Sequence, residues 1–347
     1  MKRSLCSGFC GQNPEEEIIF GCKRILVQTS VFILLIFLPF LFPNSLQAQS
    51  RKNVSQFSQF QGYFNPGLTG YEGSVVRGFV RNQWSGFEGA PQTFFFSTEI
   101  DFGELSGEID PALMGKNAVS LNLMHDTYGA FRENELLLNY ASRVRLTENH
   151  NLRLGVGVIY QSIRLDGNAM TTEEQNDPTL GQYYGTFSDM ELIDLNAGIA
   201  LTHRKYYFSY AVQRLNGGKV SKGDEFMDGY PTEQFVQAGF REALTPNVSI
   251  ITNAFFRSRK DLPNVMELNM KALLMDKVWL GGGIRFDYAS NLQFGFLTKR
   301  MKVGYVYEFP MGQSYLLPGS THEFTVTLNL FRDNVRNKFA QDEVLMW

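Results

Sequence analysis

The residues of this sequence that could carry acid–base chemistry are few and scattered. Its 4 histidines, His125, His150, His203 and His322, lie far apart in a chain of 347 residues. His125 and Asp126 form the one suggestive pair, but neighbouring residues on a strand point to opposite faces, so they cannot act as one inward couple. The sequence contains no nucleophile elbow, phosphate-binding loop or metal-ligand cluster. We therefore expect no enzyme activity, no cofactor and no metal site.

Charged residues of both signs recur on one face of the predicted strands. They are Arg77, Arg81, Glu99, Asp101, Arg143, Arg145, Asp194, Glu267, Lys271, Arg285, Asp287, Lys302, Glu308 and Glu323. A selective pore more often has a ring of one sign, whereas opposite charges pair with one another. The pattern favours a packed or plugged interior over an open channel.

Strands must position these charges, because apolar and polar residues alternate along most of the sequence. Val76 and Val80, for example, share a face opposite Arg77 and Arg81, which is the two-residue period of a strand. The alternation recurs in about fourteen segments of about ten residues, a number and a length typical of transmembrane barrels. The prediction is an all-β protein, an outer-membrane antiparallel β-barrel, with a large soluble β-sandwich as the alternative.

The start of the chain has the pattern of an export signal. Lys23 and Arg24 precede the apolar run from Val31 to Phe42, and Ser45 to Ala48 offers a small-residue cleavage end. An uncleaved anchor is the alternative, but spanning a bilayer needs about twenty apolar residues. We predict a cleaved signal peptide over residues 1–48, a barrel over 49–331 and a C-terminal periplasmic tail over 332–347.

Charge and cysteine usage narrow the function classes further. The net charge is -3 and there is no basic stripe, so nucleic acid is not an expected partner. The 3 cysteines, Cys6, Cys10 and Cys22, all precede the predicted cleavage site. The exported chain would therefore have neither disulfides nor thiol chemistry.

The predicted connections between strands alternate in length. Residues 147–150, 203–205, 245–247, 275–277 and 298–300 make short connections, whereas residues 166–188, 216–232 and 311–321 make long ones. Outer-membrane barrels have short periplasmic turns and longer outer loops. Residues 102–116 form a long connection on the short-turn side, and we predict a periplasmic contact there.

One stretch resembles a known family. The run Asn65-Pro66-Gly67-Leu68-Thr69-Gly70, followed by Arg81-Asn82-Gln83-Trp84, Gly86-Phe87, Glu88-Gly89-Ala90-Pro91 and Thr93, resembles the N-terminal signature of the PorP/SprF family of type IX secretion membrane proteins. Candidate site residues carried by this likeness are Asn65, Pro66, Gly70, Arg81, Asn82, Gln83, Trp84, Gly86, Gly89 and Pro91. They either fix turns and pair Arg81 with an inward carboxylate such as Glu99 or Asp101, or dock a partner.

The resemblance implies a function as well as a fold. It implies a non-enzymatic protein of the cell outer membrane that serves type IX secretion or gliding motility in contact with outer-membrane lipid. Its partners would be a cognate large surface adhesin, whose export or attachment it aids, or the lipoproteins of the periplasmic motor ring. The alternative is a channel for diffusion or uptake of small solutes.

Overall fold

The computed structural model describes residues 53–107, 117–170, 181, 183–224, 226, 230–312, 319–331, 344 and 346–347. The chain divides into two units, residues 1–48 and 49–347, and all described residues belong to the second. The predicted signal peptide therefore lies outside the described residues. The same is true of residues 332–343 and 345 of the predicted tail.

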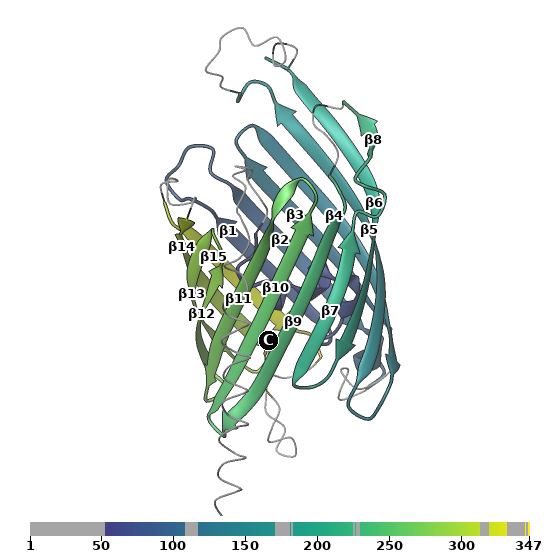
Figure 1. Cartoon of the computed structure of the whole chain (residues 1–347), viewed down its shortest axis with the longest axis vertical. Coiled ribbons are helices and arrows are strands. Elements are labelled where there is room, and N and C mark those ends of the chain that lie inside the picture. The colour runs from purple at the N-terminus through teal and green to yellow at the C-terminus, as the bar shows by residue number, and fades with distance from the viewer. Residues whose placement is uncertain are drawn as a thin grey trace, which may run out of the picture. The chain divides into compact units, whose positions relative to one another are not determined.

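The described residues form fifteen strands in one antiparallel sheet (Figure 1). The strands are β1 Val75–Asn82, β2 Gln92–Asp101, β3 Asn117–Tyr128, β4 Phe131–Arg145, β5 Asn151–Asp166, β6 Phe187–Thr202, β7 Tyr206–Gln213, β8 Val220–Gly223, β9 Glu233–Thr245, β10 Val248–Arg259, β11 Leu262–Leu274, β12 Val278–Arg285, β13 Ala289–Leu297, β14 Met301–Pro310 and β15 Thr321–Asn329. Short helices are η2 Phe57–Gln59, α2 Gln61–Phe64, η3 Pro66–Leu68 and α3 Phe102–Leu105.

The sheet closes on itself. Each strand pairs with the next around the ring, β7 pairs with β9, and β15 returns to pair with β1. Among the described strands, only β8 lies outside the ring. It pairs with the part of β6 that extends past the end of β7. Fifteen strands less β8 make a closed barrel of fourteen, which confirms the predicted class and strand number.

Apolar side chains cover the outside of the barrel and polar ones the inside. On β5, Leu154, Val156 and Val158 are 50%, 59% and 46% exposed, whereas Arg153 and Gln161, which point to the other face, are buried. A soluble sandwich would bury its apolar face, so an exposed apolar band belongs against lipid. The alternation predicted from the sequence is confirmed, and the sandwich is wrong.

Strands β4, β5 and β6, with 15, 16 and 16 residues, are longer than the other described strands. Figure 1 shows β5 and β6 rising with β8 above the rest of the barrel. In this upper part the outward side chains include charged ones, as in the exposed ion pair between Arg164 and Asp189. These strands therefore continue past the apolar band.

The two ends of the barrel differ. Residues 203–205, 246–247, 275–277 and 298–300 make tight turns at the end where β1 begins and β15 finishes, which we call the short-turn end. At the opposite, far end, β5 is joined to β6 and β7 to β9 by longer connections. This end also has short turns at 129–130, 260–261 and 286–288, so loop length alone separates the ends only in part.

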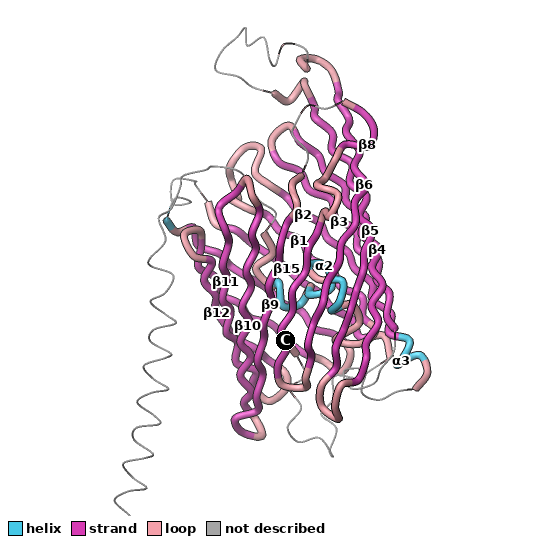
Figure 2. The backbone as a smooth tube through the Cα atoms, turned by 45° about the vertical axis from the view of Figure 1, so that its right-hand side comes forward, coloured by secondary structure: helices cyan, strands magenta, loops and turns pink. Residues whose placement is uncertain are grey.

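The segment before β1 fills the interior. Residues 53–74, which we call the plug, include η2, α2 and η3, and Figure 2 shows α2 surrounded by strands. All of these residues except Asn53, Tyr63 and Glu72 are buried. The sequence suggests only a short polar lead up to Tyr63, but the structure places this lead in the lumen. The predicted plugged interior is confirmed.

Candidate functional site

The first signature residues fix the plug to the wall. Pro66 begins η3, where its missing N–H costs nothing, and Asn65 caps this turn by accepting a hydrogen bond from the Gly67 backbone N–H at 2.8 Å. Asn65 Nδ2 also donates to the carbonyl oxygens of Ile199 on β6 and Tyr210 on β7, both at 3.2 Å. One side chain thus shapes the plug and ties it to two strands.

Aromatic side chains pack the plug against other strands of the wall. Phe60 lies edge-on to Phe79 and Phe95, with ring centroids 4.9 and 5.2 Å apart, and Phe57 lies 5.1 Å from Phe255. Phe79, Phe95 and Phe255 are strand residues that point inward, against the general rule that the inner face is polar. They form an apolar patch that receives the plug.

A buried network of charges surrounds Arg81, whose side chain is 1% exposed. Its guanidinium donates to Glu308 and Glu323 at 3.0 Å each and to the hydroxyl of Ser55 in the plug at 2.8 Å. Arg285 also pairs with Glu308 at 3.2 Å. Glu323 in turn accepts the Ser55 backbone N–H at 2.9 Å. The wall and the plug are therefore one hydrogen-bonded unit.

The prediction that Arg81 pairs with Glu99 or Asp101 is wrong. Arg81 stands opposite Glu323 of the neighbouring β15, whereas Glu99 stands opposite Val75, six positions further along β1. Six residues of strand span about 20 Å, which is beyond the reach of an arginine. Both carboxylates pair with other arginines of the wall instead.

A second cluster of charges involves Glu72, near the end of the plug. Arg77 contacts Glu72 at 2.7 Å and also pairs with Glu99, and Lys302 Nζ lies 3.2 Å from Glu72. Burial by itself would raise the pKa of Glu72, but the charges of Lys302 and Arg77 outweigh it and lower this pKa to about 2. Glu99 accepts the Gly70 backbone N–H at 2.6 Å, where Gly70 takes a φ of 69°.

The signature therefore divides between two places. Asn65, Pro66 and Gly70 lie in the plug and Arg81 in the lumen, whereas Asn82, Gln83, Trp84, Gly86, Gly89 and Pro91 lie where β1 turns into β2 at the far end. In that turn the Gln83 backbone N–H donates to the Pro91 carbonyl at 3.0 Å, and Gly86 and Gly89 take φ of 97° and 71°. For the signature residues at the far end, both predicted roles, fixing a turn and docking a partner, stay predictions.

Above the plug a cavity opens toward the far end. Its lining combines plug residues with charged and aromatic residues of the wall: Asn53, Tyr63, Asp126, Glu133, Arg214, Tyr230, Glu233, Arg257 and Arg259. Burial, and then the charge of Glu133, raise the pKa of Tyr230 well above its usual value, and its hydroxyl donates to Glu133 at 2.7 Å. Arg214 lies over the Tyr230 ring at 4.9 Å. The polar side chains of this lining can bind polar groups. They pair with one another, however, and do not form a catalytic arrangement.

The histidines form no catalytic set among the described residues. Asp126 is buried and accepts the Thr93 hydroxyl, while His125 faces outward and bonds Asn134, as the strand period predicts. His150 and His203, from neighbouring turns, lie with ring centroids 5.0 Å apart, although their meeting is not among the predictions from the sequence.

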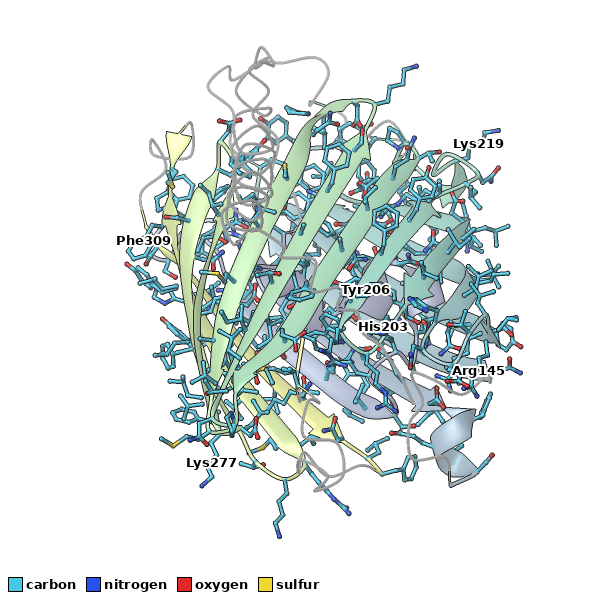
Figure 3. The ribbon with its side chains drawn as sticks, turned by 60° about the horizontal axis from the view of Figure 1, so that its bottom comes forward. Arg145, His203, Tyr206, Lys219, Lys277 and Phe309 are labelled. Carbon is cyan, nitrogen blue, oxygen red and sulfur yellow. The ribbon has the colours of Figure 1, made fainter. Side chains whose placement is uncertain are left out.

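His203 also stacks on Tyr206, 4.5 Å away, as Figure 3 shows at the short-turn end. Burial, followed by the charges of His150 and Lys205, lowers the pKa of His203. Both histidines lie in short-turn connections, and from these positions their proximity could have been predicted.

Among the described residues, no group of three or more His, Cys, Asp or Glu side chains could hold a metal ion. None of the helices in the described part of the chain has the length and apolar character needed to cross a membrane.

Several solved structures are similar to this chain at low identity. The alignment with the CymD monoaromatic hydrocarbon channel covers 82% of this chain and 95% of the channel's chain, with 10% identity and a TM-score of 0.43. A Pseudomonas aeruginosa FadL homologue covers 76% and 92%, with 8% identity and a TM-score of 0.42. The Ralstonia pickettii toluene transporter TbuX covers 76% and 90%, with 10% identity and a TM-score of 0.41. No curated protein sequence matches this chain.

A closed fourteen-stranded barrel with an apolar outer band and a filled lumen defines this protein as an outer-membrane β-barrel of the cell. The family described as "Type IX secretion system membrane protein PorP/SprF" matches residues 46–328. The chain belongs to that family, and the resemblance found in the sequence is confirmed.

Proposed function

We propose that this barrel serves type IX secretion as a non-enzymatic docking protein. It aids export or surface attachment of a cognate large adhesin, or links the outer membrane to the lipoproteins of the periplasmic motor ring. The mature chain begins near Gln49, after removal of residues 1–48. Membership of the secretion family supports the general role, and the geometry of the barrel supports docking over transport.

The filled lumen is the observation that carries this proposal. The plug packs aromatic rings against the inner wall, and it forms hydrogen bonds with the wall at Ser55, Asn65 and Gly70. Buried arginine–carboxylate pairs occupy the space beside it, as at Arg81 and Glu323. Solute flow would require these pairs to separate, so partners are better engaged at the ends of the barrel than through it.

The far end offers a surface for such engagement. Arg164 and Asp189 pair on the outside of β5 and β6 at 2.7 Å, and Arg132 lies 3.6 Å from Asp166 close by. These charges would be costly in hydrocarbon, so this part of the wall stands in water. We assign the far end to the cell surface and the short-turn end to the periplasm, in keeping with short periplasmic turns.

Single cysteines test the orientation and the partners together. All native cysteines precede residue 23, so Arg164→Cys and Lys299→Cys each give one reactive site in the exported chain. An impermeant maleimide is expected to label whole cells carrying Arg164→Cys and to leave Lys299→Cys unlabelled. Crosslinking should capture a large secreted protein from position 164 and a motor lipoprotein from position 299.

Two results would count against the proposal. Labelling at position 299 and not at 164 would reverse the orientation. Steady ion conductance by the purified wild-type chain in planar bilayers, together with no crosslinked partner at either position, would favour the channel for small solutes.

A further inference from the structure

The described residues of the last stretch, Val344, Met346 and Trp347, lie inside the barrel. Their exposed fractions are 3%, 0% and 1%, and the C-terminal end falls within the barrel in both Figure 1 and Figure 2. They share one apolar cluster with Leu68 and Tyr71 of the plug. The tail predicted from the sequence therefore returns to the lumen at its tip.

The rest of this cluster comes from the wall. Its members are inward-facing residues of strands β6, β7 and β10 to β13: Ala200, Tyr207, Ile251, Leu273, Trp279 and Leu297. Each lies within four residues of a connection at the short-turn end. We call this set, with Leu68 and Tyr71, the aromatic chamber. Most other inward positions are polar, and this apolar patch is covered by Val344, Met346 and Trp347.

Trp347 is held on several sides. Its ring lies edge-on to Tyr207, with centroids 4.9 Å apart, and 5.6 Å from Tyr71. The Arg241 guanidinium lies over the same ring at 4.2 Å, a cation–π arrangement. Lys271 Nζ donates to the Trp347 carbonyl oxygen at 3.3 Å. These contacts specify an aromatic side chain together with a carbonyl-bearing backbone, which is the chemistry of a peptide.

The sequence of the tail suits a tethered ligand. Residues 332–343 read Arg-Asp-Asn-Val-Arg-Asn-Lys-Phe-Ala-Gln-Asp-Glu, with charges of both signs, whereas residues 344–347 read Val-Leu-Met-Trp. A segment covalently joined to its own binding site competes at an effective concentration on the order of millimolar. A second peptide must compete with that concentration, so the chain's own residues 344–347 regulate access.

We propose that the aromatic chamber is a peptide-binding site for short apolar segments that present a tryptophan, and that residues 344–347 are its built-in occupant. A periplasmic partner with a segment of the same chemistry exchanges with this tip through the short-turn end. That this partner is periplasmic rests on the orientation proposed above, whereas peptide binding by the purified chain tests the site itself whatever the orientation.

Peptide binding in detergent tests the site directly. The probe is a synthetic peptide of residues 338–347, titrated by calorimetry into the full chain and into a chain lacking residues 344–347. The shortened chain is expected to bind at least tenfold more tightly than the full chain, because its chamber is empty. A peptide with alanine in place of the final tryptophan should bind at least tenfold more weakly to it.

Point variants connect the binding to the chamber. In the shortened chain, Arg241→Ala should weaken peptide binding several-fold, since the cation over the tryptophan ring is lost. Lys277→Ala, an exposed lysine at the same end (Figure 3), is the matched control and should leave binding unchanged. If the shortened chain does not fold, a full chain carrying Trp347→Ala replaces it and should bind the wild-type peptide more tightly than the wild-type chain does.

The proposal is overturned if a folded shortened chain binds no peptide. It is equally overturned if the alanine peptide binds as well as the wild-type peptide, because binding would then be general stickiness of an apolar segment. Equal binding by the Arg241→Ala and Lys277→Ala chains would place the peptide outside the chamber and would also refute it.

Discussion

Replacing Arg81 with alanine is expected to lower the free energy of unfolding by about 3–5 kcal/mol, the usual cost of removing one partner from a buried ion pair. Arg81 is 1% exposed and contacts Glu308, Glu323 and Ser55 within 3.0 Å. Glu308 retains Arg285. Glu323 retains two backbone N–H groups of the plug but loses this guanidinium, so a buried carboxylate is left without its cation.

The measurement is urea unfolding of the purified barrel in detergent, followed by the change in gel mobility between unheated and boiled samples. The control is Arg164→Ala, because Arg164 pairs with Asp189 on the outer surface, where ion pairs contribute little. Adding Glu323→Gln to Arg81→Ala should recover part of the loss, since the stranded charge disappears. A midpoint for Arg81→Ala equal to that of the control, or no recovery in the double variant, would refute the reasoning.

Three further outcomes are expected. Phe60→Ala should cost about 3–5 kcal/mol of unfolding free energy, the usual range for a buried phenylalanine, and an unchanged urea midpoint would show that the aromatic patch does not hold the plug. Gly198→Val should expose the plug to added protease, because a side chain there overlaps Asn65; the neighbouring Ala197→Val is the control, and equal protection of both would contradict a tight fit. Glu72→Gln should lower stability at pH 7 and match wild type near pH 2, because a folded-state pKa of about 2 means that the stabilisation is lost as the pH falls from about 4.5 to about 2; a difference between the two chains that is independent of pH would exclude this carboxylate as the cause.

The barrel could be predicted from the sequence because its wall obeys a local rule. On β5, Leu154, Val156 and Val158 must meet lipid, and residues between them must not, so the two-residue period is visible along the chain. Counting such segments gives the number of strands. An even count is also what an antiparallel closed ring needs, and the pairing of β1 with β15 shows that the ring closes.

The plug could not be predicted in the same way. Gln56, Gln59 and Gln61 are buried, yet in the sequence they read as a soluble lead, because glutamine is mostly found on surfaces. They are buried here because the inner wall is itself polar; Gln56 Nε2, for example, donates to Thr325 at 3.0 Å. A local pattern reveals which residues avoid water, but not which polar residues bind a polar lumen.

Pairs across the lumen lie beyond sequence reasoning for a related reason. Arg81 and Glu308 are 227 positions apart in the chain, and only the register of a closed ring brings them together. The cross-strand neighbour of each inward charge depends on the number of residues in every preceding turn. Sequence alone predicts that Arg81 finds a carboxylate, but it selects the wrong one.

The position of the plug has a consequence for how the barrel is held closed. The seam between β1 and β15 joins the first and last strands of the barrel. The Ser55 and Gln56 N–H groups bind Glu323 on β15, and Arg81 on β1 reaches across to Glu308 on β14. These bonds tie the plug and β1 to the strands on the other side of the seam. The segment that leads the barrel in the chain therefore helps to hold its first and last strands together.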